Sequence, residues 1–199
     1  DELYPRAQCE LNYEKDYELL IATVLSAQCT DKRVNEVTKV LWENYDIFSI
    51  AKANKKDIEK IIRSVGSYTK KSAYLLEIAN RLVTDYEGHV PCNRKYLESL
   101  PGVGRKTANV VLSNIFDVPA IAVDTHVERV SKRLKLAYQN DSVGKVEEKL
   151  MKKFPENRWS KLHHQLVLFG RYQCKAIHPE CERCKLQEFC KYYKEHNQK

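Results

Sequence analysis

Residues 100–107 read LPGVGRKT, a proline and two glycines followed directly by two cations. Pro101 continues a helix poorly, and Gly102 and Gly104 can both adopt positive φ. The stretch therefore predicts a sharp turn between two helices. An ordinary helix–turn–helix corner is one interpretation. The other is a phosphate grip, in which the backbone N–H groups of Gly102, Val103 and Gly104 act together with the positive end of the second helix.

Lys106 stands in the first turn of that second helix, where the helix dipole disfavours a cation. We therefore expect its pKa to lie below the ~10.4 that is usual for lysine. A neutral amine is the form that a Schiff-base nucleophile needs. The neighbouring Arg105 is expected to contact a phosphate or to remain a surface charge.

A second candidate residue, Asp124, lies in the stretch VDTHVERV at 123–130, at the N-terminal edge of another helix. Thr125 and Glu128 form a capping-box pattern at the start of that helix. Asp124 has two interpretations, an ionised partner for Lys106 and a plain N-cap. Distance along the sequence does not decide whether the two side chains meet.

Helical periodicity runs through almost the whole chain. The first expected helices are 16–28 and the two segments that follow, with Asp16, Asp31 and Asn54 as their N-caps. The next are 71–86, a short helix at 93–100 that Asn93 caps, and 105–116. The last three start at Thr125, start at Ser142, and cover 159–170, which Gly170 ends. Few segments alternate with a period of two, so the predicted fold class is all-α. The composition loosens at DVPA (117–120), which is the predicted boundary between two parts of the chain.

The 199 residues are enough for one large domain or two small ones with a real core. A formal net charge of +7 permits an anionic partner such as nucleic acid. No apolar run approaches the roughly 20 residues that span a bilayer, and no secretory signal is present. We therefore expect no membrane partner.

Four of the seven cysteines crowd into residues 174–190 with the spacing C-x6-C-x2-C-x5-C, namely Cys174, Cys181, Cys184 and Cys190. This clustering and the odd total argue against a secreted disulfide scaffold and indicate a reducing compartment. Four thiolates this close in sequence favour a metal site, and from ligand chemistry zinc and an iron–sulfur cluster fit about equally. Unligated thiols are the third interpretation. Arg183 and Lys185 would present a basic face to phosphate.

Together these motifs resemble the endonuclease III branch of the helix–hairpin–helix DNA glycosylases. The matching stretches are LPGVGRKTANVV (100–111), VDTHVERV (123–130), LSAQCTD (25–31) and the four-cysteine loop (174–190). The resemblance implies two helical lobes with a DNA cleft between them. One is a six-helix lobe over 8–118 that holds the helix–hairpin–helix motif, and the other joins 1–7 to 119–199 and carries a 4Fe–4S cluster on the four cysteines.

The resemblance also implies an activity, the removal of oxidised pyrimidines from double-stranded DNA and cleavage of the strand at the abasic site by β-elimination. The enzyme would be a monomer in the cytoplasm, at the bacterial nucleoid. Lys106 matches the family's nucleophile and Asp124 its carboxylate. Gln28 matches a glutamine that fills the space left by the flipped nucleotide, although by itself it suggests a surface residue at a helix C-terminus. The other implied DNA contacts are Gly102, Val103, Gly104, Arg105, Thr125, His126, Arg183 and Lys185.

Ser67 departs from the family pattern, because that position usually carries a bulky apolar wedge, often Leu. The family's first helix is also largely absent ahead of Asp1. Two other functions remain as hypotheses. A monofunctional adenine-specific glycosylase would generally lack a lysine at position 106, and a non-catalytic DNA-binding module would not need both Lys106 and Asp124.

Overall fold

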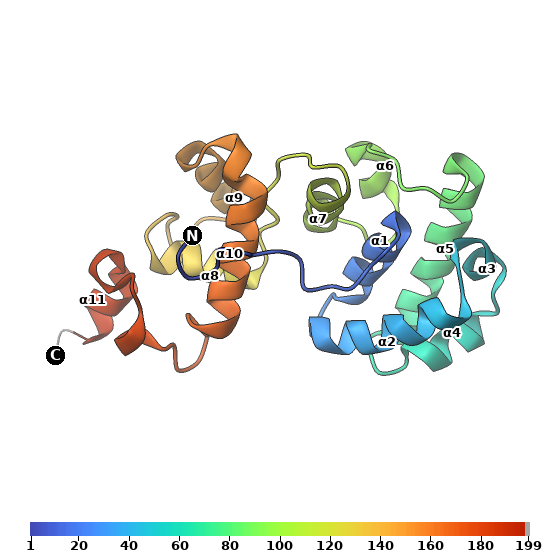
Figure 1. The fold of residues 1–199 in the computed structure, drawn as a ribbon, viewed down its shortest axis with the longest axis horizontal. Coiled ribbons are helices and arrows are strands. Elements are labelled where there is room, and N and C mark those ends of the chain that lie inside the picture. Colours follow the sequence, from blue (N-terminus) through green and yellow to red (C-terminus); the bar gives the residue numbers. More distant parts are fainter. Residues whose placement is uncertain (198–199) are drawn as a thin grey trace. The chain divides into compact units, whose positions relative to one another are not determined.

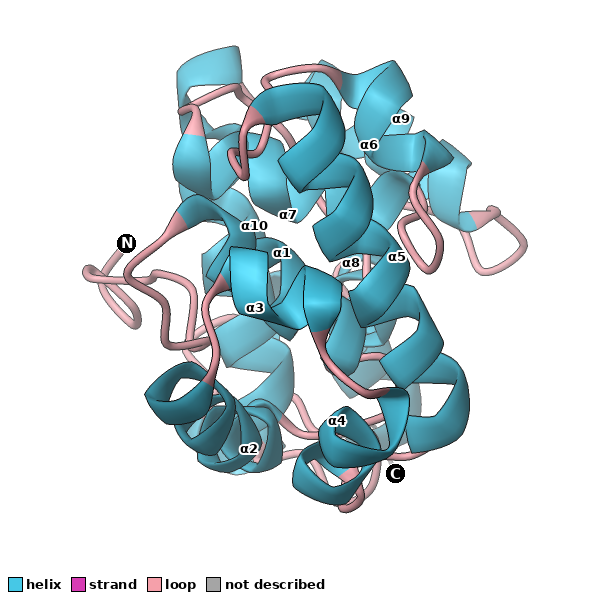
Figure 2. Cartoon of the chain, turned by 90° about the vertical axis from the view of Figure 1, so that its right-hand side faces the viewer, coloured by secondary structure: helices cyan, strands magenta, loops and turns pink. Residues whose placement is uncertain are grey.

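The computed structural model describes residues 1–197, and within them the chain folds into eleven α-helices and three short 3-10 helices (Figure 1). No strand occurs in this described part (Figure 2), so the all-α prediction is confirmed. None of the described helices is both long and apolar enough to cross a membrane.

The chain divides into two compact units. We call Cys9–Phe116 the hairpin unit, and Asp1–Gln8 together with Asp117–Lys199 the cysteine unit. These bounds lie within two residues of those that the family resemblance implied, 8–118 and 1–7 with 119–199. The junction at Asp117 coincides with the loosened DVPA segment.

The hairpin unit contains seven helices rather than the six implied by the resemblance, and all of its residues are described: α1 Asp16–Leu25, α2 Asp31–Asn44, α3 Ile47–Lys52, α4 Lys55–Ile62, α5 Tyr68–Tyr86, α6 Arg94–Ser99 and α7 Arg105–Ile115. The additional helix is α3, which Asp46 caps by accepting from Ser49 N at 2.7 Å. Every residue of α1 from Glu18 to Leu25 is buried, and α1 packs against α2, α5 and α7. A helix that is buried all round forms the centre of its unit.

Two of the predicted N-caps differ from those observed. Lys15, and not Asp16, is the N-cap of α1, and Asp16 Oδ2 accepts from Val90 N at 2.8 Å. Thr30, and not Asp31, caps α2. The predicted caps Asn54, Asn93 and Ser142 are confirmed.

The described part of the cysteine unit contains four α-helices, α8 Thr125–Arg133, α9 Val143–Lys153, α10 Trp159–Tyr172 and α11 Lys191–Asn197. The first three surround one core, in which α8 packs against both α9 and α10. The buried core side chains are Ile121, Val123, Val127, Val130, Ala137, Val146, Leu150, Leu166 and Phe169. Cys174 and Cys184 pack against this core, so the start and the middle of the four-cysteine loop are anchored to it.

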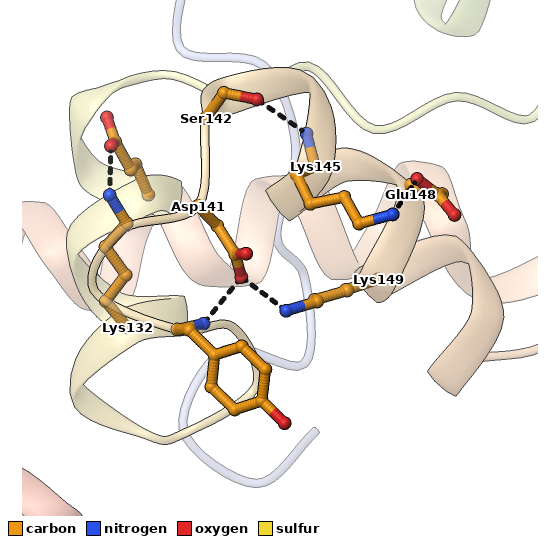
Figure 3. Close-up of polar contacts among 8 residues, drawn as sticks. Lys132, Asp141, Ser142, Lys145, Glu148 and Lys149 are labelled. Atoms are coloured by element: carbon orange, nitrogen blue, oxygen red, sulfur yellow. Dashed lines mark hydrogen bonds and ion pairs between the residues drawn. The ribbon is translucent and has the colours of Figure 1, made fainter.

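The connection between α8 and α9 is held by Asp141, as Figure 3 shows. Asp141 Oδ2 accepts from Tyr138 N and from Lys149 Nζ, both at 2.6 Å. The hydrogen bond from Lys149 lowers the pKa of Asp141. Since Tyr138 belongs to the connection and Lys149 to α9, this carboxylate fixes the turn to the helix that follows it.

Gly170 lies inside α10, which continues to Tyr172, so the prediction that it ends the helix is wrong. A Cβ at this position would lie 2.9 Å from the Cβ of His126 and 3.1 Å from Cγ2 of Val130. Real Cβ atoms essentially never lie within 3.0 Å of another heavy atom, so the first of these contacts would force a displacement. The glycine therefore allows α10 to approach α8 closely.

We expect Gly170→Ala to lower the free energy of unfolding by about 1–3 kcal/mol, because the added methyl group overpacks the contact between α8 and α10. Gly144→Ala in α9 is the matched control, since no heavy atom lies within 4 Å of a Cβ there. Alanine at that helical position should stabilise the protein by about 0.5–1 kcal/mol. Denaturant unfolding of both variants measures the difference, and shifts of the same sign would contradict the packing role of Gly170.

Candidate functional site

The stretch LPGVGRKT forms a tight turn followed at once by α7. Val103 N donates to Leu100 O at 3.2 Å, and Gly102 has a φ of 75°. Proline second and a positive-φ glycine third are the features of a type II turn. A Cβ on Gly102 would lie only 2.7 Å from Cδ2 of Tyr74. Backbone conformation and space therefore both require glycine at this position.

Gly104 differs from the prediction, because its φ is −99° and lies outside the left-handed region. It is the N-cap of α7, and no side chain caps the helix. Val103 has a buried side chain, and its N–H donates within the turn, so its phosphate contact stays a prediction. The backbone groups suited to an anion are therefore those of the uncapped first turn of α7.

Lys106 is the second residue of α7, and its side chain is exposed. Within residues 1–197 no hydrogen bond or ion pair holds its Nζ. Arg105, immediately before it, is exposed as well. The first turn of α7 thus presents an uncapped N-terminus, a guanidinium and an unengaged lysine amine on one short segment.

Asp124 is the N-cap of α8, so its capping interpretation is confirmed. Its Oδ1 accepts from His126 N at 2.9 Å and from Val127 N at 2.8 Å. The predicted capping box of Thr125 and Glu128 is wrong, because Asp124 takes the cap and Glu128 instead accepts from Lys132 Nζ at 2.6 Å. Both cap bonds use Oδ1, and no described residue donates to Oδ2. One oxygen of the carboxylate therefore caps the helix, and the other accepts no hydrogen bond from the described residues.

The starts of α7 and α8 have the same backbone conformation, with φ −99° and ψ −175° at both Gly104 and Asp124. At α8 the cap residue supplies a carboxylate. At α7 it supplies no side chain, and open space surrounds the position that a Cβ would occupy. The two helices thus start with the same cap conformation. They differ in the side chain at the cap, which is a carboxylate at α8 and absent at α7.

Two arginines of α8 were missed by the sequence reasoning. Arg129 Nη2 donates to Gly170 O at 2.6 Å, and Arg133 Nη1 donates to Lys175 O at 2.7 Å and lies 3.3 Å from the sulfur of Cys174. Burial lowers the pKa of Arg129, and the charge of Arg133 adds to this effect. Their spacing of four residues puts both on one face of the helix, which was the available signal. The helix that begins at Asp124 therefore holds the start of the four-cysteine loop.

The four cysteines of the loop line a single pocket. Leu186 N donates to Cys184 Sγ at 3.4 Å, and Tyr193 N donates to Cys190 Sγ at 3.5 Å. Burial raises the pKa of the Cys181 and Cys184 thiols. No group of three or more His, Cys, Asp or Glu side chains within the described residues is arranged to hold a metal ion. The loop thus gathers the thiols around one pocket without closing them into a metal-binding group.

The remaining residues that are predicted to contact DNA are exposed or half-buried. Gln28 is exposed and has a φ of 57°, beyond the end of α1, which stops at Leu25 and not at residue 28. Thr125 is exposed and His126 is half-buried at the start of α8. Arg183 and Lys185 are exposed on the four-cysteine loop, where Lys185 Nζ pairs with Glu2 at 3.1 Å.

Comparison with known proteins gives concordant matches. The model of the HhH-GPD superfamily of base excision DNA repair proteins matches residues 21–156. Endonuclease III of Bacillus subtilis (strain 168) is 47% identical over 194 residues, which cover 96% of this chain and 87% of the relative. A trapped covalent intermediate of endonuclease III with DNA matches with a TM-score of 0.94 at 50% identity, over 98% of this chain and 92% of that one. A non-covalent endonuclease III–DNA complex matches with a TM-score of 0.96 at 49% identity, over 100% and 93%.

Proposed function

Because the chain belongs to the endonuclease III family of the HhH-GPD superfamily of base excision DNA repair proteins, we propose that it removes oxidised pyrimidines from double-stranded DNA and then cleaves the abasic strand. The observation that carries this proposal is Lys106, an exposed amine that has no partner among the described residues, in the first turn of a helix without a side-chain cap. The endonuclease III relatives and the DNA complexes they form support the choice of substrate. The bacterial endonuclease III relatives support a place of action in the cytoplasm, at the nucleoid.

Lys106 is the nucleophile of the proposed reaction. The target nucleotide first leaves the base stack, because C1′ is otherwise out of reach. The neutral amine of Lys106 attacks C1′, the bond from C1′ to the base breaks, and the base departs with that electron pair and takes up a proton. Loss of a proton from nitrogen and opening of the sugar ring give an imine. Removal of a proton from C2′ then expels the 3′ phosphate by β-elimination and breaks the strand.

Asp124 supplies the negative charge in this scheme. Its Oδ1 is committed to the N-terminus of α8, so the carboxylate is held in one orientation. Oδ2 can then assist Lys106 and stabilise the positive charge that develops on the sugar as the base leaves. A fixed charge of this kind needs no reorganisation during the reaction.

The proposed contacts with the DNA backbone do not depend on the base sequence. Amides of the first turn of α7 and the guanidinium of Arg105 bind phosphate oxygens. Gly104 leaves room for a phosphate to approach, since nothing lies within 4 Å of its Cβ position. The other proposed DNA contacts are Gln28, Gly102, Thr125, His126, Arg183 and Lys185.

We assign a 4Fe–4S cluster to the four-cysteine loop, with Cys174, Cys181, Cys184 and Cys190 as ligands. Four thiolates are a suitable ligand set for this cluster, and N–H groups directed at the sulfurs are typical of its surroundings. The shared pocket and the two amide donors to Cys184 and Cys190 support the assignment. When bound, the cluster supplies a cross-link that holds the loop and its basic residues in place.

The native protein should release the base from a duplex that contains one thymine glycol and should break the strand on the 3′ side of the lesion. The reason is that an amine nucleophile leaves an imine, which undergoes β-elimination. Denaturing gel electrophoresis and chromatography of the released base measure the two products. Base release that leaves the strand intact would contradict the lyase step, and excision of adenine from a mismatch in place of thymine glycol would favour the monofunctional alternative.

The purified protein should contain about four iron atoms per chain and absorb broadly in the blue region, because a 4Fe–4S cluster contains four iron atoms. Cys184→Ser should lose most of this absorption, since it removes one ligand. Cys92→Ser is the matched control, because Cys92 is exposed and far from the loop in sequence. Zinc in place of iron, or full absorption in Cys184→Ser, would contradict the assignment.

A further inference from the structure

Lys71 is a buried cation for which the reaction above provides no role. It lies in the first turn of α5, and only 5% of it is exposed. Its Nζ donates to Leu25 O at 2.9 Å and to Ala27 O at 2.7 Å. An ammonium is costly to remove from water unless new hydrogen bonds replace the lost ones. The two carbonyl oxygens therefore account for its position.

Leu25 O is the last carbonyl of α1, and Ala27 O lies in the turn that follows, directly ahead of Gln28. The last carbonyls of a helix lack partners within it and carry the negative end of its dipole, so a lysine there is favourable. Gln28 follows at once with a φ of 57°. Residues other than glycine keep this left-handed conformation only where their surroundings impose it. The bonds from Lys71 provide such a constraint.

The backbone of Lys71 fixes a second loop, the one that leads into α5. Lys71 N donates to Ser67 O at 3.0 Å, and Ser67 is itself left-handed with a φ of 58°. A Cβ on Gly66 would lie 3.9 Å from Gln28 O, so the two loops are in contact. One residue thus bonds to the Gln28 loop (26–29) through its side chain and to the Ser67 loop (63–67) through its backbone.

We propose that Lys71 is a positioning residue that locks the Gln28 loop and the Ser67 loop into one rigid insert for the DNA duplex. This inference rests on the proposed function and on the family resemblance, by which Gln28 matches a glutamine that fills the space left by the flipped nucleotide and Ser67 stands at the usual wedge position. The side chain of Ser67 is too small to displace a base pair by itself. The fixed backbone of the paired loops therefore provides the shape that enters the duplex, and loops ordered beforehand lose less freedom on binding.

Single-turnover excision from a thymine glycol duplex tests the proposal. Lys71→Met keeps the length of the side chain but removes its donors, and misplacement of the loops should lower the rate by about 10- to 100-fold. Lys71→Arg should recover most of the rate, because a guanidinium can donate to both carbonyls. The matched control is Lys60→Met, which removes an exposed positive charge from α4 of the same unit and should leave the rate unchanged.

A double-mutant cycle with Gln28→Ala separates positioning from a general structural effect. If Lys71 acts through Gln28, Lys71→Met should lower the rate less in the Gln28→Ala background than in the native protein. The inference would be overturned if Lys71→Met lowered the excision rate by the same factor in the native and the Gln28→Ala backgrounds. A native rate in Lys71→Met would overturn it as well. A native protein without any excision would instead overturn the proposed function. Thermal unfolding checks each variant, and Lys71→Gln, which keeps one donor group, replaces Lys71→Met in the cycle if that variant does not fold.

Discussion

Lys106→Gln should lose covalent trapping by borohydride on thymine glycol duplex DNA, and its strand cleavage should fall by at least about 10⁴-fold. Glutamine has a similar length, but its amide nitrogen cannot attack C1′ or form an imine. The variant should keep native stability, because no described residue holds the Lys106 side chain in place. Trapping gels and unfolding curves, measured on the same preparations, compare the two proteins.

Arg105→Gln is the matched control for Lys106→Gln, because it removes a charge from the neighbouring residue on the same exposed turn. It should weaken DNA binding by the loss of one phosphate contact, and more so at low salt. At saturating protein concentration it should still form the covalent adduct. An adduct that survives in Lys106→Gln and is lost in Arg105→Gln would reverse the two assigned roles.

Asp124→Asn should lower the rate of base release by about 10²–10³-fold while leaving the free energy of unfolding nearly unchanged. Asparagine caps a helix about as well as aspartate does, so the bonds to His126 N and Val127 N are retained. What disappears is the negative charge on Oδ2, which the proposed scheme requires. Single-turnover kinetics and thermal unfolding measure the two effects separately.

Asp124→Ala tests the capping role and the catalytic charge of Asp124 together. It removes the cap as well as the charge, so it should lose about 1 kcal/mol of stability in addition to the catalytic effect. A full rate of base release in Asp124→Asn would mean that the residue only caps α8. A large loss of stability in Asp124→Asn would contradict the prediction that asparagine caps α8 as well as aspartate does. A lower rate in that variant would then not support a catalytic role.

Local patterns predicted the features that depend on neighbouring residues. Helical periodicity indicated an all-α chain, and the caps Asn54, Asn93 and Ser142 follow from the preference of short polar side chains for helix starts. The turn at Pro101–Gly102 could likewise be predicted, because a positive φ there favours glycine.

Several errors arose where a distant segment decides the outcome. Asp16 resembles an N-cap, yet Val90 N takes its carboxylate. Gly170 resembles a helix end, yet α8 lies where its side chain would be. Arg129 and Lys71 show the same limit for the site, because their partners Gly170 O and Leu25 O lie 41 and 46 residues away in sequence. A pattern within one helix carries no information about carbonyl groups on another.

Peptide mapping of the borohydride-trapped adduct by mass spectrometry tests the central claim most directly. After digestion of the protein and DNA, the reduced sugar remnant should be attached to Nζ of Lys106, in the peptide that follows Arg105. Its presence there would show that the lysine of LPGVGRKT is the nucleophile. A remnant on any other amine, such as Lys71 or the N-terminus, would contradict the account.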